Sequence, residues 1–141
     1  MSFCFDVKEE ICKIEEKNDS CRLAIDTEVH NVKKYIGAYM AELGHVDAIV
    51  FTAGVGENDE YLREKFCTGL EEMGIKLDIE KNAKSLARLG VDETEISTPD
   101  SRIKVFMIPT NEELVIVEDT LAIMNGTYNP NHLEMDYSFA K

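Results

Sequence analysis

The sequence predicts an α/β fold, in which helices flank a β-sheet. Two short, continuous apolar runs rich in β-branched residues, at 46–52 and 103–109, have the length and composition of buried strands. Between and around them, apolar residues recur every three or four positions, as on one face of a helix. The 141 residues, 44% of them hydrophobic, are enough for one ordinary core. We therefore expect a single α/β domain, or one piece of a larger domain.

The first predicted helix covers residues 22–43 and ends at Gly44, a residue type that often follows a helix. Its apolar stripe consists of Ile25, Val29, Val32, Ile36, Tyr39 and Leu43. The first strand, 46–52, is expected to be covered on both faces because its apolar run is unbroken. It leads into the sequence "TAGVGEN", which we expect to form a loop.

Three further elements follow in the second half of the chain. A helix is predicted over 60–73 from the stripe Leu62, Phe66, Leu70 and Met73, with Gly74 after it. A short helix is predicted around 82–89, and then comes the strand 103–109. The last helix runs to residue 125, with Thr110 and Glu113 spaced as a capping box. We place a domain at 1–126 and an irregular tail at 127–141.

Composition excludes several classes of function. Fifteen basic and 28 acidic residues give a formal net charge of −13, which repels phosphate backbones and anionic lipid headgroups. No apolar run approaches the roughly 20 residues that span a bilayer, and the first residues lack the pattern of a signal peptide. The four cysteines follow no metal-ligand spacing. We expect a cytoplasmic protein with free thiols, no nucleic-acid partner and no membrane association.

Two polar segments, "TAGVGEN" and "PTNEE", each follow a predicted strand. In open α/β sheets, ligands bind outside the carboxyl ends of strands, so the two segments are expected to face one crevice. Gly54 and Gly56 would permit a positive φ and close approach of a ligand to the backbone. A plain tight turn between strand and helix explains the glycines equally well.

Several stretches together resemble the C-terminal portion of acetate kinase. They are "DAIVFTAGVGEND", "REKFCTGLEEMGIKLD" and "ISTPDSRIKVFMIPTNEELVIVEDT", with "KYIGAY" before them, and the resemblance extends over residues 6–121. Acetate kinases are members of the sugar kinase, Hsp70 and actin superfamily. The resemblance therefore implies part of a ribonuclease H-like, or actin-like ATPase, domain.

The resemblance also implies which residues contact a nucleotide. In similar kinases the segment matching Gly54, Val55, Gly56, Glu57 and Asn58 wraps the adenosine and α-phosphate side of ATP. A family Asp-x-Arg sequence that contacts adenine and ribose matches Asp6, Val7 and Lys8. Lysine here departs from the pattern, because an ammonium group cannot reproduce a planar guanidinium. An exposed, charged start to a helix is the alternative for these three residues.

Glu112 matches the glutamate that, in the family, helps to hold the Mg²⁺ accompanying the ATP phosphates. The neighbouring Glu113 is the second candidate, although the capping box already gives it a structural role. For Glu112, the alternative is an acidic residue that complements the dipole at the start of a helix.

Intact members of the family convert acetate and ATP into acetyl phosphate and ADP, reversibly, and they form homodimers through this portion. The sequence has no counterpart of the family's amino-terminal half, which carries the acetate pocket and the catalytic aspartate. We therefore expect this chain to supply nucleotide and magnesium contacts, to contain no catalytic residue and to be inactive alone. Two alternatives stay open: a non-catalytic nucleotide-binding or dimerisation module, and a relative of propionate or butyrate kinases.

Overall fold

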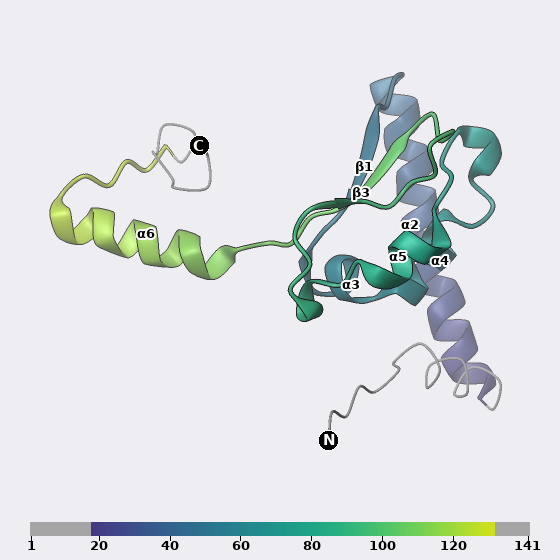
Figure 1. Cartoon of the computed structure of the whole chain (residues 1–141), viewed down its shortest axis with the longest axis horizontal. Helices are drawn as coiled ribbons and strands as arrows, with labels where there is room; N and C mark the ends of the chain where they lie inside the picture. Colours follow the sequence, from purple (N-terminus) through teal and green to yellow (C-terminus); the bar gives the residue numbers. More distant parts are fainter. Residues whose placement is uncertain (1–17, 132–141) are drawn as a thin grey trace. The chain divides into compact units, whose positions relative to one another are not determined.

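The computed structural model describes residues 18–131, which include every helix and strand named below. The described residues fall into two compact units that divide between Pro109 and Thr110 (Figure 1). The first unit contains all three strands, and the second contains the helix α6.

The sheet of the first unit has the strand order β1-β3-β2. β1 (Ala48–Phe51) and β3 (Lys104–Met107) are parallel, with Phe51 opposite Met107 at their carboxyl ends. The short β2 (Thr94–Glu95) pairs antiparallel with β3. Both predicted strands are confirmed, and the segments that follow them leave from the same edge of the sheet. The Ile108 amide donates to the Phe51 carbonyl, 3.0 Å away, and so extends the pairing beyond this edge.

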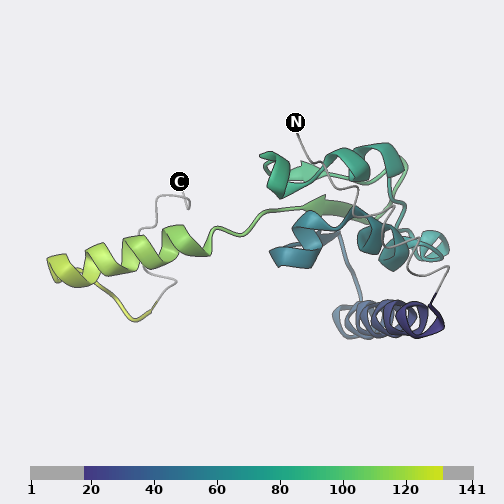
Figure 2. The ribbon, with the colours of Figure 1, turned by 90° about the horizontal axis from the view of Figure 1, so that it is seen from below.

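The core lies against one face of this sheet. Its fully buried hydrophobic residues are Ile75, Ile96, Ile103, Val105 and Met107. Phe51 stacks on Phe66 of α4 (Glu60–Cys67), with ring centroids 6.1 Å apart. The long helix α2 (Asp19–Leu43) lies along one side of the unit (Figures 1 and 2). From its predicted stripe, Val29, Val32 and Ile36 pack against this core, whereas Tyr39 and Leu43 are exposed. The prediction of this helix is confirmed, with a start three residues earlier because the Asn18 side chain caps it.

The prediction that β1 is covered on both faces is wrong for the described residues. Phe51 is buried, but the alternate residues Ala48 and Val50 are exposed, Val50 by 48% of its surface. Together with Phe106 and Ile108 they line an open groove on the second face of the sheet. Among residues 18–109, the sheet therefore has one covered and one uncovered face.

The prediction of a helix over 60–73 is confirmed only in its first half and is wrong after Cys67. α4 ends at Cys67, and Gly69 has a φ of 83°, a left-handed conformation that interrupts a right-handed helix. A single 3₁₀ turn, η1 (Glu71–Met73), follows. The short helix expected at 82–89 is likewise divided, into α5 (Ile79–Lys84) and the 3₁₀ turn η2 (Ala87–Leu89).

The second unit contains α6 (Glu112–Asn125). Its cap is Asn111, whose side-chain oxygen accepts from the Leu114 amide at 3.2 Å, so the capping box predicted to start at Thr110 is wrong. The predicted end is confirmed, because Gly126 takes the left-handed conformation after the helix. Across residues 18–131, no helix combines the length and the apolar character needed to span a bilayer.

Candidate functional site

The segment after β1 is a short helix, α3 (Ala53–Asn58), where a loop was expected. Ala53 begins it with a φ of 59°, the one positive φ of a non-glycine residue among residues 18–131. Neither Gly54 nor Gly56 has a positive φ, so the backbone conformation does not require glycine at either position. The sharp turn between strand and helix is therefore made by the alanine before the glycines.

The two glycines of α3 differ in their surroundings. A Cβ atom added to Gly56 would lie 3.1 Å from the carbonyl carbon of Phe51, tighter than ordinary contacts. The chain's own backbone thus explains why Gly56 has no side chain. A Cβ atom on Gly54 would meet nothing within 4 Å. Packing among the described residues therefore does not require a glycine at position 54. The space beside Gly54 is open to a ligand.

A buried arginine supports α3 from α4. Arg63 is completely inaccessible to solvent, and its Nη1 donates to the Gly56 carbonyl at 2.8 Å. Its Nε donates to Asn82 Oδ1 at 2.7 Å, and its Nη2 donates to the carbonyls of Asn82 and Ser85. Burial lowers the pKa of Arg63, and the nearby charge of Glu60 opposes this shift. The four oxygen atoms that accept these bonds are uncharged, so the guanidinium serves as a structural hub.

A second arginine contacts the last residue of α3. The backbone amide of Arg88 donates to Asn58 Oδ1 at 2.7 Å, and its guanidinium Nη1 donates to the Asn58 carbonyl. The next residue, Asp59, accepts from the Leu62 amide at 2.9 Å and so caps α4. The carboxyl-terminal half of α3 is therefore joined directly to α4 and η2, and through Arg63 to α5.

The structure brings together one of the two predicted nucleotide-binding groups. Gly54, Val55, Gly56, Glu57 and Asn58 lie consecutively in α3 at the carboxyl edge of the sheet, with Val55 54% exposed. The other group, Asp6, Val7 and Lys8, lies outside the described residues. The nucleotide role of both groups stays a prediction.

The predicted magnesium ligand, Glu112, is the exposed first residue of α6, in the second unit. Within residues 18–131, no three side chains of histidine, cysteine, aspartate or glutamate gather as a metal site would require. A single carboxylate can still fit Mg²⁺, because this cation usually keeps several waters and takes other oxygens from substrate phosphates.

Sequence reasoning missed Arg63, Asn82 and Arg88. One signal was present: Arg63 stands three positions before Phe66, on the side of α4 that faces the interior. A charged residue at such a position requires buried partners, and Asn82 with its neighbouring carbonyls supplies them. No comparable pattern distinguishes Arg88 from other exposed basic residues.

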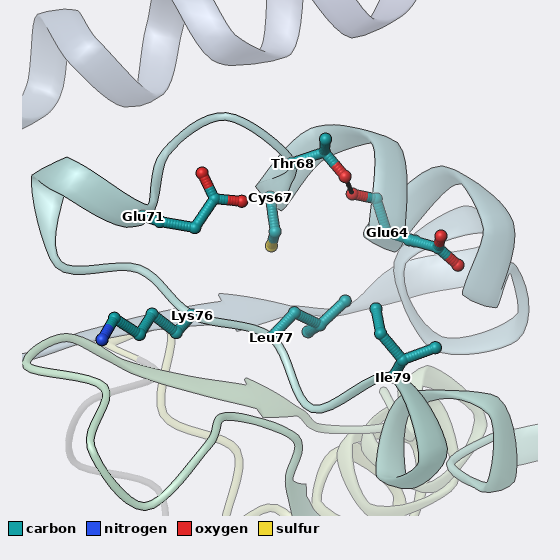
Figure 3. A pocket seen from close by; sticks show the side chains of 7 residues that line it. All are labelled: Glu64, Cys67, Thr68, Glu71, Lys76, Leu77 and Ile79. Atoms are coloured by element: carbon teal, nitrogen blue, oxygen red, sulfur yellow. Dashed lines mark hydrogen bonds between the residues drawn. The ribbon is translucent and has the colours of Figure 1, made fainter.

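A second, smaller hollow lies beside α4 (Figure 3). It encloses about 180 Å³ and is lined by Glu64, Cys67, Thr68, Glu71, Lys76, Leu77 and Ile79. Burial raises the pKa of the Cys67 thiol to about 12, which keeps it protonated and unreactive. Lys76 pairs with Asp100 at 2.6 Å. This hollow is too small for a nucleotide, and pocket sites for such ligands are several times larger.

Comparison with known proteins identifies the family. A sequence model of the Acetokinase family matches residues 2–118. The chain belongs to this family. It is 55% identical over 121 residues to the acetate kinase of Trichlorobacter lovleyi, a match that covers 86% of this chain and 28% of that protein. It is 51% identical over 134 residues to the acetate kinase of Treponema pallidum, covering 94% of this chain and 29% of that protein.

Solved structures of family members share the fold. The acetate kinase of Porphyromonas gingivalis superposes with a TM-score of 0.67 at 41% identity, over 83% of this chain and 29% of that one. The acetate kinase of Entamoeba histolytica gives a TM-score of 0.69 at 30% identity, over 84% and 30%. A propionate kinase from Francisella tularensis gives 0.62 at 34% identity, over 77% and 27%. The predicted fold class, part of an actin-like α/β domain, is confirmed, and the chain spans less than a third of these relatives.

Proposed function

We propose that this chain is the nucleotide-binding part of an acetate kinase, which transfers a phosphoryl group reversibly between ATP and acetate. The observation that carries the proposal is the 55% identity over 121 residues to a protein named acetate kinase. The 34% identity to a propionate kinase makes a propionate or butyrate kinase the second candidate. The acyl group is bound elsewhere in such an enzyme, so this chain does not choose between them.

Within the chain, we assign the nucleotide to the segment Gly54–Asn58, assisted by Asp6, Val7 and Lys8. The position of α3 supports this assignment, since the carboxyl edge of parallel strands is where α/β proteins bind ligands. The open space beside Gly54 supports it as well. Glu112 would hold the Mg²⁺ that accompanies the phosphates, through water, and that ion supplies charge neutralisation for the transferring group.

Phosphoryl transfer depends on positioning and on electrostatic stabilisation of the transferring group. The chain offers nucleotide contacts but no group that we assign to acetate or to the transition state. We therefore propose that it binds Mg·ATP without turning it over. We also propose a cytoplasmic homodimer, with neither a nucleic-acid nor a membrane partner. A module that binds nucleotide or dimerises without belonging to an active kinase is the remaining alternative.

A chimera tests the proposed function directly. In it, this chain replaces the matching 28% of the T. lovleyi acetate kinase. The proposal predicts formation of acetyl phosphate, trapped as its hydroxamate, at more than about 1 per second, an ordinary enzyme rate. A chimera that folds as a dimer, yet forms no acetyl phosphate, would favour the non-catalytic module.

The isolated chain gives the complementary result. With acetate, ATP and magnesium it is predicted to form no acyl hydroxamate, while calorimetry detects binding of Mg·ATP. Turnover by the isolated chain would show that catalytic groups lie among residues to which we assign none. Absence of binding would remove the nucleotide assignment.

A further inference from the structure

One end of α3 is held by a residue that no motif of the family resemblance includes. Arg88 lies 30 positions after Asn58 and makes two hydrogen bonds to it. The first runs from the Arg88 backbone amide to Asn58 Oδ1, and the second from the Arg88 guanidinium to the Asn58 carbonyl. Both oxygen atoms of Asn58 are therefore engaged by Arg88.

These bonds matter because α3 has only six residues. A helix this short is not stable by itself, so its conformation depends on contacts with the rest of the unit. Arg63 holds the Gly56 carbonyl, and Arg88 holds Asn58. Gly54 and Val55, at the other end, are exposed. The segment is thus fixed at one end and open at the other.

We propose that Arg88 is a positioning residue for the nucleotide segment and acts through Asn58. On this proposal, which rests on the proposed nucleotide role of residues 54–58, Asn58 links α3 to η2 and does not contact the nucleotide through its side-chain oxygen. Arg88 sets the orientation in which Gly54 and Val55 meet the ligand.

Arg88 can be substituted with less risk to the fold than Arg63. Arg63 is fully buried, so removing it endangers the fold. The Arg88 side chain is 38% exposed, and its ion pair with Glu60 is long, at 3.9 Å. Arg88→Ala removes the guanidinium bond to the Asn58 carbonyl and leaves the backbone amide in place. Arg102→Ala is a matched control, because the exposed Arg102 also donates from its guanidinium to a carbonyl, that of Met73.

The first measurement uses the full chain without nucleotide. The Asp59 amide, which donates to the Val55 carbonyl, reports whether α3 stays closed. We expect hydrogen exchange at Asp59 to rise about tenfold in Arg88→Ala, which loses one hydrogen bond from a charged group. In Asn58→Leu, which loses a bond between uncharged groups, we expect a rise of about fivefold. Exchange in β1 and β3, and exchange at Asp59 in Arg102→Ala, should stay as in the wild type. Unchanged exchange at Asp59 in Arg88→Ala would overturn the proposal.

The second measurement is the dissociation constant of Mg·ATP. We expect it to rise about five- to tenfold in Arg88→Ala and in Asn58→Leu, but not in Arg102→Ala. Asn58→Asp keeps an oxygen that can accept from the Arg88 amide, so its loss should be smaller than that of Asn58→Leu. If Asn58 instead contacted the phosphates, the added carboxylate would repel them and Asn58→Asp would be the weaker binder; that order would overturn the proposal.

The two measurements separate this proposal from the function on which it rests. Faster exchange at Asp59 with unchanged Mg·ATP affinity would overturn the positioning role and leave nucleotide binding intact. If the wild-type chain bound no Mg·ATP, the proposed nucleotide-binding function of the segment would be wrong. The proposal that Arg88 positions this segment for a nucleotide would then be wrong as well. The exchange result would then still decide whether Arg88 fixes α3.

Discussion

Ala53 occupies a backbone conformation that alanine rarely adopts. Its φ of 59° places it in the left-handed region, where a Cβ atom costs roughly 1–2 kcal/mol. The residue stands at the junction of β1 and α3, directly before the candidate segment. Strain of this kind tends to occur at functional sites, where neighbouring contacts maintain it.

Ala53→Gly should therefore stabilise the fold by about 1 kcal/mol, because glycine relieves the strain. The matched control is Ala38→Gly, at an exposed position inside α2, which should destabilise by about 1 kcal/mol. Urea unfolding of both variants measures the two free energies. A loss of stability in Ala53→Gly comparable to that in Ala38→Gly would show that Ala53 is not strained.

Burial changes the chemistry of the Cys67 thiol. Its pKa of about 12 leaves roughly 1 thiol in 10,000 ionised at pH 8. Because the thiolate is the reactive form, iodoacetamide should leave Cys67 unmodified in the folded chain. The partly exposed Cys21, also a free thiol, is the internal reference and should be alkylated. Peptide mapping before and after unfolding in urea measures this, and equal labelling of both cysteines in the folded chain would contradict it.

At the scale of elements, the sequence predicted what depends on local patterns. α2 and both parallel strands follow from periodicity and from β-branched runs, and Gly126 ends α6 as expected. The break after α4 was missed because Leu70 and Met73 continue the apolar stripe although they lie beyond the end of the α-helix. Periodicity indicates which residues face the core. A break in the helix at Gly69 can still leave the next apolar residues facing the core at the same spacing.

Local sequence patterns could not predict the helical conformation of α3 or its contacts with Arg63 and Arg88. A sequence with two glycines in six residues has low helix propensity, so a loop was the reasonable expectation. Hydrogen bonds from Arg63 and Arg88, which come from other elements, hold the helix instead. The sequence could therefore place the candidate segment at the sheet edge, but not its conformation or its supports.

The hub formed by Arg63 and Asn82 should contribute strongly to stability. Asn82→Ala removes the acceptor of Arg63 Nε and the donor to the Glu60 carbonyl, and both groups are buried. We expect a loss of about 2–4 kcal/mol in the free energy of unfolding, since two buried polar groups lose partners. Lys84→Ala, an exposed change in the same helix, is the control and should cost less than about 0.5 kcal/mol. Equal unfolding midpoints for the two variants would show that the hub is not important for stability.

At the scale of the whole molecule, the uncovered face of the sheet predicts self-association. The first unit exposes Ala48 and Val50 beside Phe106 and Ile108, and chains seldom leave contiguous apolar surface in water. Light scattering should give the mass of a dimer or larger species for the wild type. Val50→Lys should lower that mass, whereas Leu23→Lys, which adds the same charge to the exposed side of α2, should not. A monomeric wild-type chain would contradict the prediction.

The most direct test of the nucleotide assignment is the affinity of Gly54→Val for Mg·ATP, measured by calorimetry. Because no atom of the described structure lies within 4 Å of a Cβ at Gly54, the variant should keep the fold, which circular dichroism verifies. Gly56→Val cannot serve, since its Cβ would crowd the Phe51 backbone whether or not a ligand binds. If the nucleotide approaches the backbone at Gly54, the added side chain should weaken binding at least about tenfold, as expected for a steric clash of more than about 1.4 kcal/mol. A folded Gly54→Val chain that binds Mg·ATP as tightly as the wild type would show that the nucleotide does not bind against this segment.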